Sequence, residues 1–379
     1  MDFHLSPEQL ALRDRVIAFC RRHCQPGQEA ARDREPAYPA ELHQAMADSG
    51  ILGHCLPAAY GGGDGGTVEL CVINEELARC STSATNILFI NGICGALLGL
   101  AGSETQKGEY LRGVIEGRLR FAFALTEPGA GSDAAGIRMR ADRDGDGYVL
   151  NGTKLYTTGA ADADFILTAV RTSMEGKASR GTSLLIVPRR SAGLEITPLD
   201  KIAGNDVASC RVEYHDVRVP PDACLGGENQ GWSFLMLGGG LERLSVAASC
   251  VGMARAVLDE VLAHVATREQ FGQPVGRFQA VQHQLADMAT RIEAMQLLTY
   301  AAAWKAAGGR SAVKEVSMAK VFAAEGINEI VTYGMRLLGA KAYLSETPMP
   351  RRLRESLLAL YAGGTPEIQR NIIARSLGL

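Results

Sequence analysis

The feature that most constrains the fold of this chain is a change in hydrophobic period along its length. Near the N-terminus, Ser6, Pro7 and Gln9 form a helix-capping pattern, and apolar residues then recur at helical spacing through the first third. From about Arg120 the spacing changes to two, in short runs rich in β-branched and aromatic residues. After Gly231 the helical spacing returns. Two helical regions on either side of a β region predict an α+β fold.

These patterns divide the chain into three predicted domains, helical over 1–119, β over 120–227 and helical over 228–379. In the first domain we expect helices around Pro39–Asp48, Val68–Arg79 and Ile87–Leu100. The expected strands are Phe121–Leu125, Tyr148–Leu150, Phe165–Val170, Ser183–Val187 and Arg211–Tyr214. The C-terminal helices are expected to be interrupted at Arg268–Arg277 and at Gly339–Pro350.

Composition narrows the class of protein. The chain has 379 residues, 46% of them apolar and 21% charged, with a net charge of -3. These values are globular averages, and they indicate no electrostatic site for nucleic acid or an anionic membrane. The nine cysteines are scattered and odd in number, which indicates reduced thiols in a cytoplasmic protein. The uncharged stretch from Ser81 to Ser103 contains asparagines and glycines, so we expect a buried helix there and no membrane span.

Two apparent metal motifs are better explained structurally. Asp142, Asp144 and Asp146 match half of a calcium loop, but Thr153 occupies its twelfth position and predicted strands flank it, so a hairpin turn is the better interpretation. Cys20 and Cys24 lack a second ligand pair at zinc-site spacing. We therefore expect no metal.

The most informative segment, Leu125–Asp133, follows a predicted strand and contains Gly129 and Gly131. Glycines there allow backbone N–H groups to approach a planar or anionic ligand closely, and Thr126 and Ser132 add hydroxyl donors. Chemistry alone leaves an ordinary tight turn as the alternative.

The amino-acid sequence of this segment resembles a signature of the acyl-CoA dehydrogenase family, Thr-Glu-Pro-Gly-Ala-Gly-Ser-Asp. The resemblance covers nearly the whole chain. It implies an N-terminal helical domain, a central β-barrel or sandwich and a C-terminal four-helix bundle. The other matching segments are Pro57–Gly62, Glu75–Arg79, Asn151–Lys154, Asp216–Pro220, Arg268–Gly272 and Gly364–Gln369.

The resemblance implies FAD as the cofactor. It places Phe123, Leu125 and Thr126 against the flavin ring. In the expected strand 154–158, Tyr156 packs on the isoalloxazine, where the family often has Trp, and the Thr158 hydroxyl bonds flavin N5. The other implied cofactor-binding residues are Gly131, Ser132, Arg268, Gln270, Phe271, Gln279, Arg336, Gly339, Thr365 and Glu367.

Part of this set resembles a segment that reaches the FAD of a neighbouring subunit, namely Arg268, Gln270 and Phe271. A guanidinium there suits a pyrophosphate, and the resemblance implies a homo-oligomer, a dimer of dimers. Relatives often read Gln-x-x-Gly-Gly-x-Gly where this chain has Arg336–Ala342. Residues with side chains stand there in place of glycines that let the backbone approach the FAD closely, so this FAD contact is in doubt. A non-catalytic subunit of a heteromeric complex is therefore an alternative.

The reaction needs a carboxylate that removes the α-proton of the thioester. Many family members carry it as Glu immediately before Gly-Thr near the C-terminus, where this chain has Gly363. Members resembling isovaleryl-CoA dehydrogenase place it in a Leu-Glu-Arg segment, which predicts Glu242 as the base here, with Glu367 as the competing candidate. The Gly363 N–H is expected to bond the thioester carbonyl, and Ser132 and Arg243 to contact the substrate.

Gly238–Gly240, immediately before Glu242, allows two interpretations. The first, slightly favoured, is a helix that starts after the glycines. The second is space kept for a bulky or branched acyl group.

The resemblance thus implies an FAD enzyme that oxidises an acyl-CoA to its enoyl thioester and passes electrons to an electron-transfer flavoprotein. One alternative is the same chemistry on an acyl group bound to an acyl carrier protein in secondary metabolism. Oxidases and monooxygenases of the same fold are less favoured, because a dehydrogenase-type base is present.

Overall fold

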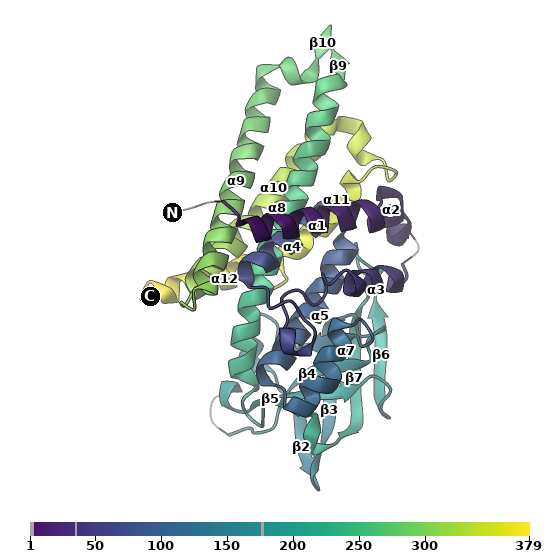
Figure 1. The fold of residues 1–379 in the computed structure, drawn as a ribbon, viewed down its shortest axis with the longest axis vertical. Coiled ribbons are helices and arrows are strands. Elements are labelled where there is room, and N and C mark those ends of the chain that lie inside the picture. Colours follow the sequence, from purple (N-terminus) through teal and green to yellow (C-terminus); the bar gives the residue numbers. More distant parts are fainter. Residues whose placement is uncertain (1–3, 35, 176–177) are drawn as a thin grey trace. The chain divides into compact units, whose positions relative to one another are not determined.

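The structure is a computed structural model that describes residues 4–34, 36–175 and 178–379. The chain forms two compact units. The first contains the N-terminal residues up to 34, Gly65–Thr85 and Gly240–Leu379, and the second contains Pro36–Asp64 and Asn86–Gly239 (Figure 1).

The first unit is helical. Its helices are α1 (Pro7–His23), α2 (Pro26–Arg34), α4 (Thr67–Cys80), most of α8 (Gly231–Thr267), α9 (Gln279–Ala307), α10 (Val313–Leu338), α11 (Met349–Ser356) and α12 (Pro366–Ser376). The predicted capping pattern at α1 is confirmed, because the Ser6 hydroxyl accepts from the Gln9 N–H and the Gln9 side chain accepts from the Ser6 N–H.

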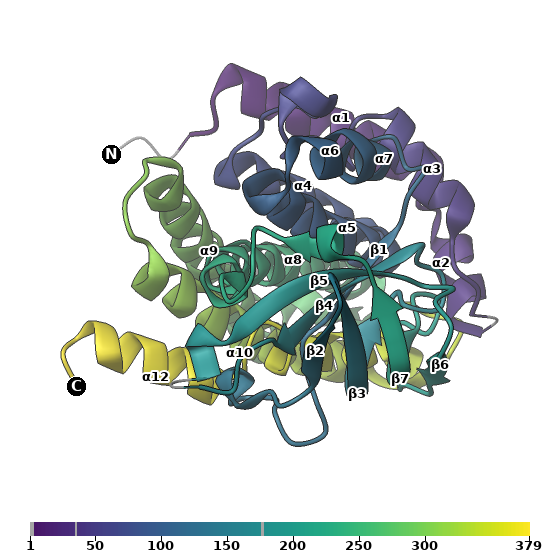
Figure 2. The same ribbon diagram turned by 90° about the horizontal axis from the view of Figure 1, so that it is seen from below.

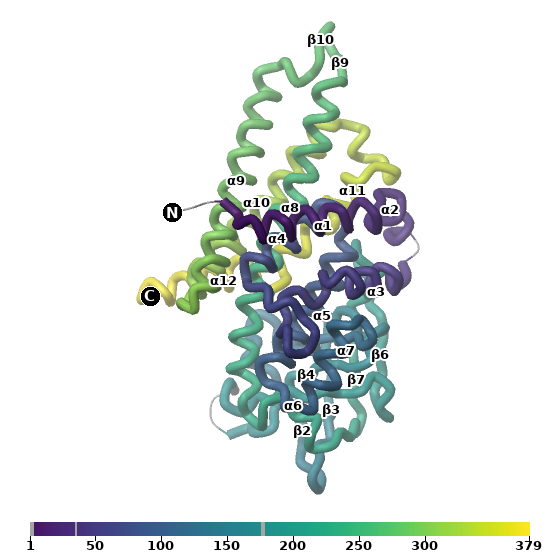
Figure 3. Tube along the Cα trace, in the orientation of Figure 1, coloured from purple at the N-terminus to yellow at the C-terminus, as the bar shows by residue number. Residues whose placement is uncertain are grey.

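Both predicted interruptions among the C-terminal helices are confirmed. Between α8 and α9 the chain makes a short hairpin of β9 (Glu269–Gln270) and β10 (Gln273–Pro274), which the trace in Figure 3 shows at the far end of the two helices. Between α10 and α11 lies a 3-10 turn, Gly339–Tyr343.

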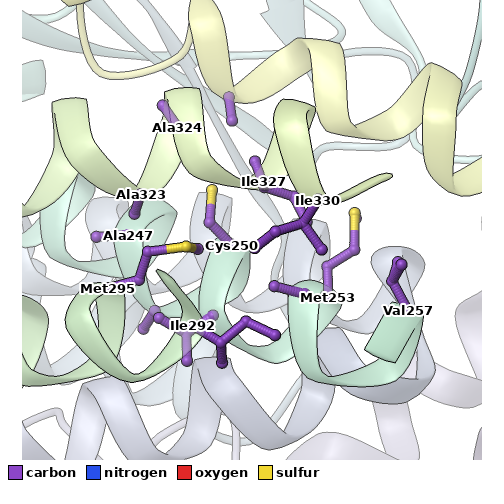
Figure 4. Close-up of a cluster of buried hydrophobic side chains, with 14 of the residues drawn as sticks. Ala247, Cys250, Met253, Val257, Ile292, Met295, Ala323, Ala324, Ile327 and Ile330 are labelled. Atoms are coloured by element: carbon purple, nitrogen blue, oxygen red, sulfur yellow. The ribbon is translucent and has the colours of Figure 1, made fainter. Parts of the chain in front are cut away.

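Small and flexible side chains form the core of this unit. Figure 4 shows part of it, with residues of α8, α9 and α10 in contact. The labelled side chains are Ala247, Cys250, Met253, Val257, Ile292, Met295, Ala323, Ala324, Ile327 and Ile330. Alanines on α8 and α10 let the helix backbones approach closely, and methionines fill the remaining gaps.

The second unit places helices against a sheet. The helices are α3 (Ala40–Asp48), most of α5 (Thr82–Ala101), α6 (Glu104–Gln106) and α7 (Arg112–Ile115), with the start of α8. The strands are β1 (Phe121–Ala124), β2 (Arg140–Asp144), β3 (Gly147–Thr158), β4 (Phe165–Arg171), β5 (Thr182–Pro188), β6 (Leu194–Leu199), β7 (Ser209–Val219) and β8 (Cys224–Leu225).

The strands form one mixed sheet in the order β6-β7-β3-β2-β4-β5-β8, with β1 parallel to β4. Figure 2 shows β2, β3, β7 and β6 fanned side by side. β2 and β3 form the hairpin predicted from the aspartates, with Asp144 opposite Gly147. β4 is apolar on both faces: Ile166 and Val170 belong to one core cluster and Leu167 to another.

α5 is the one described helix that is long and apolar enough to cross a membrane, by length and composition only. Four of its residues, Ile93, Cys94, Leu97 and Leu98, belong to the core cluster of the second unit. This burial agrees with the buried helix expected from the sequence.

The interpretation of Gly238–Gly240 as a late helix start is wrong. α8 begins at Gly231, so the glycines lie inside the helix. The cost of glycine in a helix interior, about 1 kcal/mol each against alanine, therefore applies to them.

Gly252 of α8 lies where α8 meets α4. A Cβ added at Gly252 would lie 1.9 Å from the carbonyl oxygen of Glu75. Because backbone cannot yield as a side-chain end does, Gly252→Ala should destabilise the protein by about 3 kcal/mol or more. The apparent midpoint of thermal unfolding should fall by several degrees.

The matched control is Gly27→Ala in α2, where an added Cβ meets nothing within 4 Å. It should stabilise its helix by up to about 1 kcal/mol. Equal unfolding midpoints for the two variants would contradict the close approach of α8 to α4.

Candidate active site

The segment Thr126–Ser132, here called the flavin loop, is folded by hydrogen bonds of Glu127. Its backbone pairs with Ala130, with N···O distances of 3.0 and 3.1 Å. Its carboxylate accepts the N–H groups of Arg138 and Met139 at 2.7 and 3.0 Å. The glutamate of the motif therefore holds the loop in shape, with its carboxylate engaged by backbone N–H groups.

Lys154 locks the flavin loop onto the sheet. Its side chain is fully buried. The Nζ donates to the Leu125 carbonyl at 2.9 Å and to Glu127 Oε1 at 2.8 Å. Burial lowers the pKa of Lys154 to about 8, against the opposing effect of the Glu127 charge. One ion pair thus joins the two sequence motifs 126–133 and 151–154.

The strand after Lys154 is irregular where the flavin ring is expected. The pairing of β3 with β7 shifts between Lys154 and Thr157, and Tyr156 has a left-handed backbone with φ of 55°. This bulge turns the Tyr156 ring outward, so that it is 66% exposed. The Thr158 hydroxyl lies 2.9 Å from Ser209 Oγ, which also accepts from Lys201 Nζ.

The flavin loop offers free donors to a ligand. Within the part of the chain that the structure describes, the hydroxyls of Thr126 and Ser132 have no hydrogen-bond partner. Gly129 and Gly131 are exposed, and an added Cβ at either would meet nothing within 4 Å. Phe123 and Leu125 are half-buried beside the loop. Apolar side chains next to free hydroxyl and backbone donors suit a planar, hydrogen-bonding ring system such as a flavin.

In the first unit, Glu242 of α8 lies beside the turn Gly363–Gly364 that precedes α12. An added Cβ at Gly363 would lie 3.5 Å from Glu242 Cγ. It would lie 3.8 Å from Glu242 Cδ, so the carboxylate stands beside the Gly363 backbone, and the Gly363 N–H lowers the pKa of Glu242. The predicted base and the residue at the family's usual base position are therefore neighbours.

Three side chains hold this turn by its carbonyl oxygens. Arg243 Nε donates to Gly363 O at 3.2 Å, and Lys320 Nζ donates to Gly364 O at 2.6 Å. The Gln369 amide donates to both, at 2.8 and 3.1 Å. We call Glu242, these three side chains and the turn the Glu242 cluster.

The electrostatics of the Glu242 cluster favour a proton acceptor of raised basicity. Burial raises the pKa of Glu242, while Arg243, the Gly363 N–H and Lys320 oppose the rise. Burial also lowers the pKa of Lys320 to about 8. A carboxylate with a raised pKa is the usual property of a general base.

Other predicted residues have structural contacts of their own. Thr365 is the N-cap of α12, since its hydroxyl accepts from the Ile368 N–H. Glu367 is exposed in the first turn of that helix, and its pKa is lowered by hydrogen bonds of its own N–H and of Thr365. Arg243, expected to contact the substrate, bonds the Gly363 carbonyl instead of standing free.

The residues expected to reach a neighbouring subunit are exposed. Phe271, at the tip of the hairpin 269–274, is 94% exposed and has a φ of 52°. Arg268, Gln270 and Gln279 are exposed around it. Arg336 is exposed in the last turn of α10, which ends at Gly339.

Comparison with known proteins identifies the family over the whole chain. Residues 6–118, 122–217 and 229–378 match the N-terminal, middle and C-terminal domains of acyl-CoA dehydrogenase. The chain belongs to the acyl-CoA dehydrogenase family. Its members are oxidoreductases, so the chain is an enzyme of that class, and the family predicted from the sequence is confirmed.

The chain matches curated relatives over most or all of their length. The chain is 35% identical to "Probable acyl-CoA dehydrogenase YngJ" of Bacillus subtilis, covering 100% of both chains. It is 34% identical to mitochondrial isovaleryl-CoA dehydrogenase of Pongo abelii, with 98% and 89% covered. It is 36% identical to "Caffeyl-CoA reductase-Etf complex subunit CarC" of Acetobacterium woodii, with 90% of each covered.

Solved structures confirm the predicted fold. Butyryl-CoA dehydrogenase of Megasphaera elsdenii matches with a TM-score of 0.95 and 30% identity over 100% of both chains. PigA, solved with FAD and proline, matches with a TM-score of 0.96 and 27% identity, again over 100% of both. The prolyl acyl carrier protein oxidase AnaB matches with a TM-score of 0.93 and 27% identity, covering 99% of this chain and 100% of AnaB.

Two residues of the Glu242 cluster, Lys320 and Gln369, were not among the predicted site residues. Gln369 is the last residue of the matching segment 364–369. The sequence therefore marked its position but gave no indication of its role. Lys320 falls at helical spacing with the buried Val316 and Ala323, and a lysine on the apolar face of a helix was the available signal.

The buried pair Lys154–Glu127 predicts a large stability difference. In Lys154→Met the Glu127 carboxylate remains buried without its cation, which should cost about 3–5 kcal/mol of unfolding free energy. The flavin loop should also become sensitive to proteolysis. Thermal unfolding and limited proteolysis measure the two effects.

A surface pair serves as control. Lys107 lies 3.3 Å from the exposed Glu104, and Lys107→Met should change stability by less than about 1 kcal/mol. A Lys154→Met protein as stable as Lys107→Met would show that the buried pair does not hold the loop.

Proposed function

We propose that this protein oxidises an acyl-CoA to its α,β-enoyl thioester, with Glu242 as the base that removes the α-proton. The observation that supports this most directly is the place of the Glu242 side chain beside Gly363, where an added Cβ would lie 3.5 Å from Glu242 Cγ and 3.8 Å from Glu242 Cδ. Gly363 stands where many relatives carry the base, and Glu242 supplies a carboxylate at the same place from another helix. The family membership supports acyl-CoA dehydrogenation as the reaction.

The cofactor is FAD, which the family membership and the FAD-bound neighbour PigA support. Thr126, Ser132 and the backbone of the flavin loop would hold the isoalloxazine, with the exposed Tyr156 ring beside it. When bound, FAD accepts the hydride that leaves the β-carbon of the substrate.

The residues of this chain divide the proton chemistry between them. The Gly363 N–H lies beside the Glu242 carboxylate. A thioester carbonyl that accepts from this N–H would place the α-carbon near Glu242, and the N–H would stabilise the developing enolate. Arg243, Lys320 and Gln369 act as positioning residues, because they fix the turn that carries this N–H.

The electron acceptor is proposed to be an electron-transfer flavoprotein, since the relative CarC is a subunit of a complex with one. The glycines at 238–240 lie inside α8, which favours their remaining interpretation as space for a bulky or branched acyl group. All nine cysteines are free thiols, which supports a cytoplasmic location.

The similarity to AnaB favours a second candidate, the same oxidation of an acyl group on an acyl carrier protein. Comparing flavin reduction by matched acyl-CoA and carrier-bound substrates separates the two. Preferential reduction by the carrier-bound form would replace the first proposal.

Glu242→Gln tests the base. The variant keeps the size and hydrogen-bonding shape of the side chain, so FAD and thioester should still bind. Anaerobic flavin reduction by substrate should slow by roughly 10²–10⁴-fold, as general-base catalysis is lost. In the wild type the reduction rate should rise with pH through a pKa above the ordinary value of a glutamate, because only the ionised carboxylate accepts a proton. This rise of the rate with pH should be absent in Glu242→Gln.

Glu367→Gln is the matched control, because Glu367 is the other carboxylate near the turn. The Glu367→Gln variant should retain FAD less well. When it is saturated with FAD, its rate of flavin reduction should still rise with pH as in the wild type. Normal reduction in Glu242→Gln together with lost reduction in FAD-saturated Glu367→Gln would transfer the base to Glu367. A preparation that binds no FAD at all would favour a non-catalytic subunit.

We also propose that the protein is a homotetramer, in which Arg268 and Phe271 contact the FAD of a neighbour. An aromatic side chain that is 94% exposed at a hairpin tip supports an interface there. Light scattering should give four times the chain mass of 40.4 kDa. An active, FAD-loaded monomer would refute this assembly.

A further inference from the structure

Three cysteines of the first unit lie together where α1 packs on α4, outside the flavin loop and the Glu242 cluster. Cys20 is in α1, Cys24 caps that helix, and Cys80 is the last residue of α4. The Cys20 thiol lies 3.7 Å from the Glu76 carbonyl oxygen. Cys80 follows Glu76 by four residues, so it is one helical turn further on the same face.

The Cys24 and Cys80 thiols both lie near the Cys20 thiol and raise its pKa. Two of the three are inaccessible: Cys20 is 2% exposed and Cys24 is 5% exposed. Cys80 is exposed. An exposed thiol in contact with a buried thiol is the arrangement in which one cysteine meets an oxidant and a second one resolves the product.

Two guanidiniums act on the exposed thiol, and each is part of an ion pair. The contact with Cys20 and the charges of Arg79 and Arg352 lower the pKa of Cys80, against burial and the charge of Glu76. The guanidiniums are held in place by carboxylates, Arg79 by Asp259 at 2.6 Å and Arg352 by Glu260 at 2.5 Å. An electropositive, accessible setting increases the thiolate fraction and hence the reactivity of a cysteine.

We propose that Cys80 and Cys20 form an oxidation-sensitive dithiol that closes to a disulfide on exposure to hydrogen peroxide. The Cys80 thiolate attacks the O–O bond and becomes a sulfenic acid, and one water leaves after protonation. The Cys20 thiol then attacks the Cys80 sulfur, the S–O bond breaks, and a second water leaves. Two thiols lose two electrons and two protons, and one peroxide becomes two waters.

Two other roles for the cluster are less favoured by the structure. Among the described residues no group of three or more His, Cys, Asp or Glu side chains could hold a metal ion. Cys24 is 5% exposed, so it does not offer the accessible thiol that the first step requires. The disulfide is therefore expected between α1 and α4 and not within α1.

The test uses the FAD-loaded protein treated with a small excess of hydrogen peroxide. The number of free thiols should fall by two, and a non-reducing tryptic map should show a peptide containing Cys20 linked to one containing Cys80. Trypsin cleaves after Arg21 and Arg22, so Cys20 and Cys24 leave on separate peptides. Before oxidation, iodoacetamide should modify Cys80 at least about tenfold faster than the half-buried Cys224, whose pKa burial raises.

Two variants separate the steps. In Cys20→Ser, peroxide should leave a sulfenic acid on Cys80 that dimedone traps, because no resolving thiol remains. In Cys80→Ser the loss of two thiols should not occur, while Cys224→Ser should behave as the wild type. A Cys20–Cys24 link, a link between chains, or an intact Cys80 under conditions that oxidise Cys224 would each overturn the proposal, and the wild-type map decides it even if Cys20→Ser fails to fold.

Discussion

The ion pair between Lys154 and Glu127 is the interaction on which the flavin-facing part of the structure depends. Removing both charges from water is costly, and the pair persists because each group has further partners: the Leu125 carbonyl for the ammonium and two backbone N–H groups for the carboxylate. These bonds tie the loop to β3 and to the residues that lead into β2. The hydroxyls of Thr126 and Ser132 and the exposed Gly129 and Gly131 take no part in them.

The Glu242 cluster uses charge in a similar way. Arg243 and Lys320 donate hydrogen bonds to carbonyl oxygens of the turn 363–364 rather than to carboxylates. Their charges oppose the rise in the pKa of Glu242, although burial remains the larger effect and the carboxylate is more basic than in water. Rigid backbone donors and a moderately basic carboxylate are what proton abstraction next to a carbonyl requires.

The sequence predicted the family, the α+β fold and most elements, because hydrophobic spacing reports which face of an element is buried. β3 shows where that signal weakens. The pattern predicts a strand at Tyr148–Leu150, yet the strand runs from Gly147 to Thr158, and the register shift between Leu150 and Gly152 interrupts the alternation. β6 was missed, since none of its residues is fully buried and Pro198 interrupts a short run. For the site, the sequence motifs predicted the loop and Glu242. The contact of Lys320 could not be predicted in this way, because it forms only when α10 packs against the turn before α12.

Gly363 has an evolutionary consequence. Its φ of 68° disfavours most side chains, and one placed there would begin 3.5 Å from Glu242 Cγ and 3.5 Å from Arg243 Cγ. These are ordinary contact distances, so a carboxylate at 363 would stand directly against the first and the two like charges would repel, while loss of Glu242 leaves none at this turn. With Glu242 as the proposed base, a lineage that moves the base between the two positions passes through a form with two neighbouring carboxylates or a form with none.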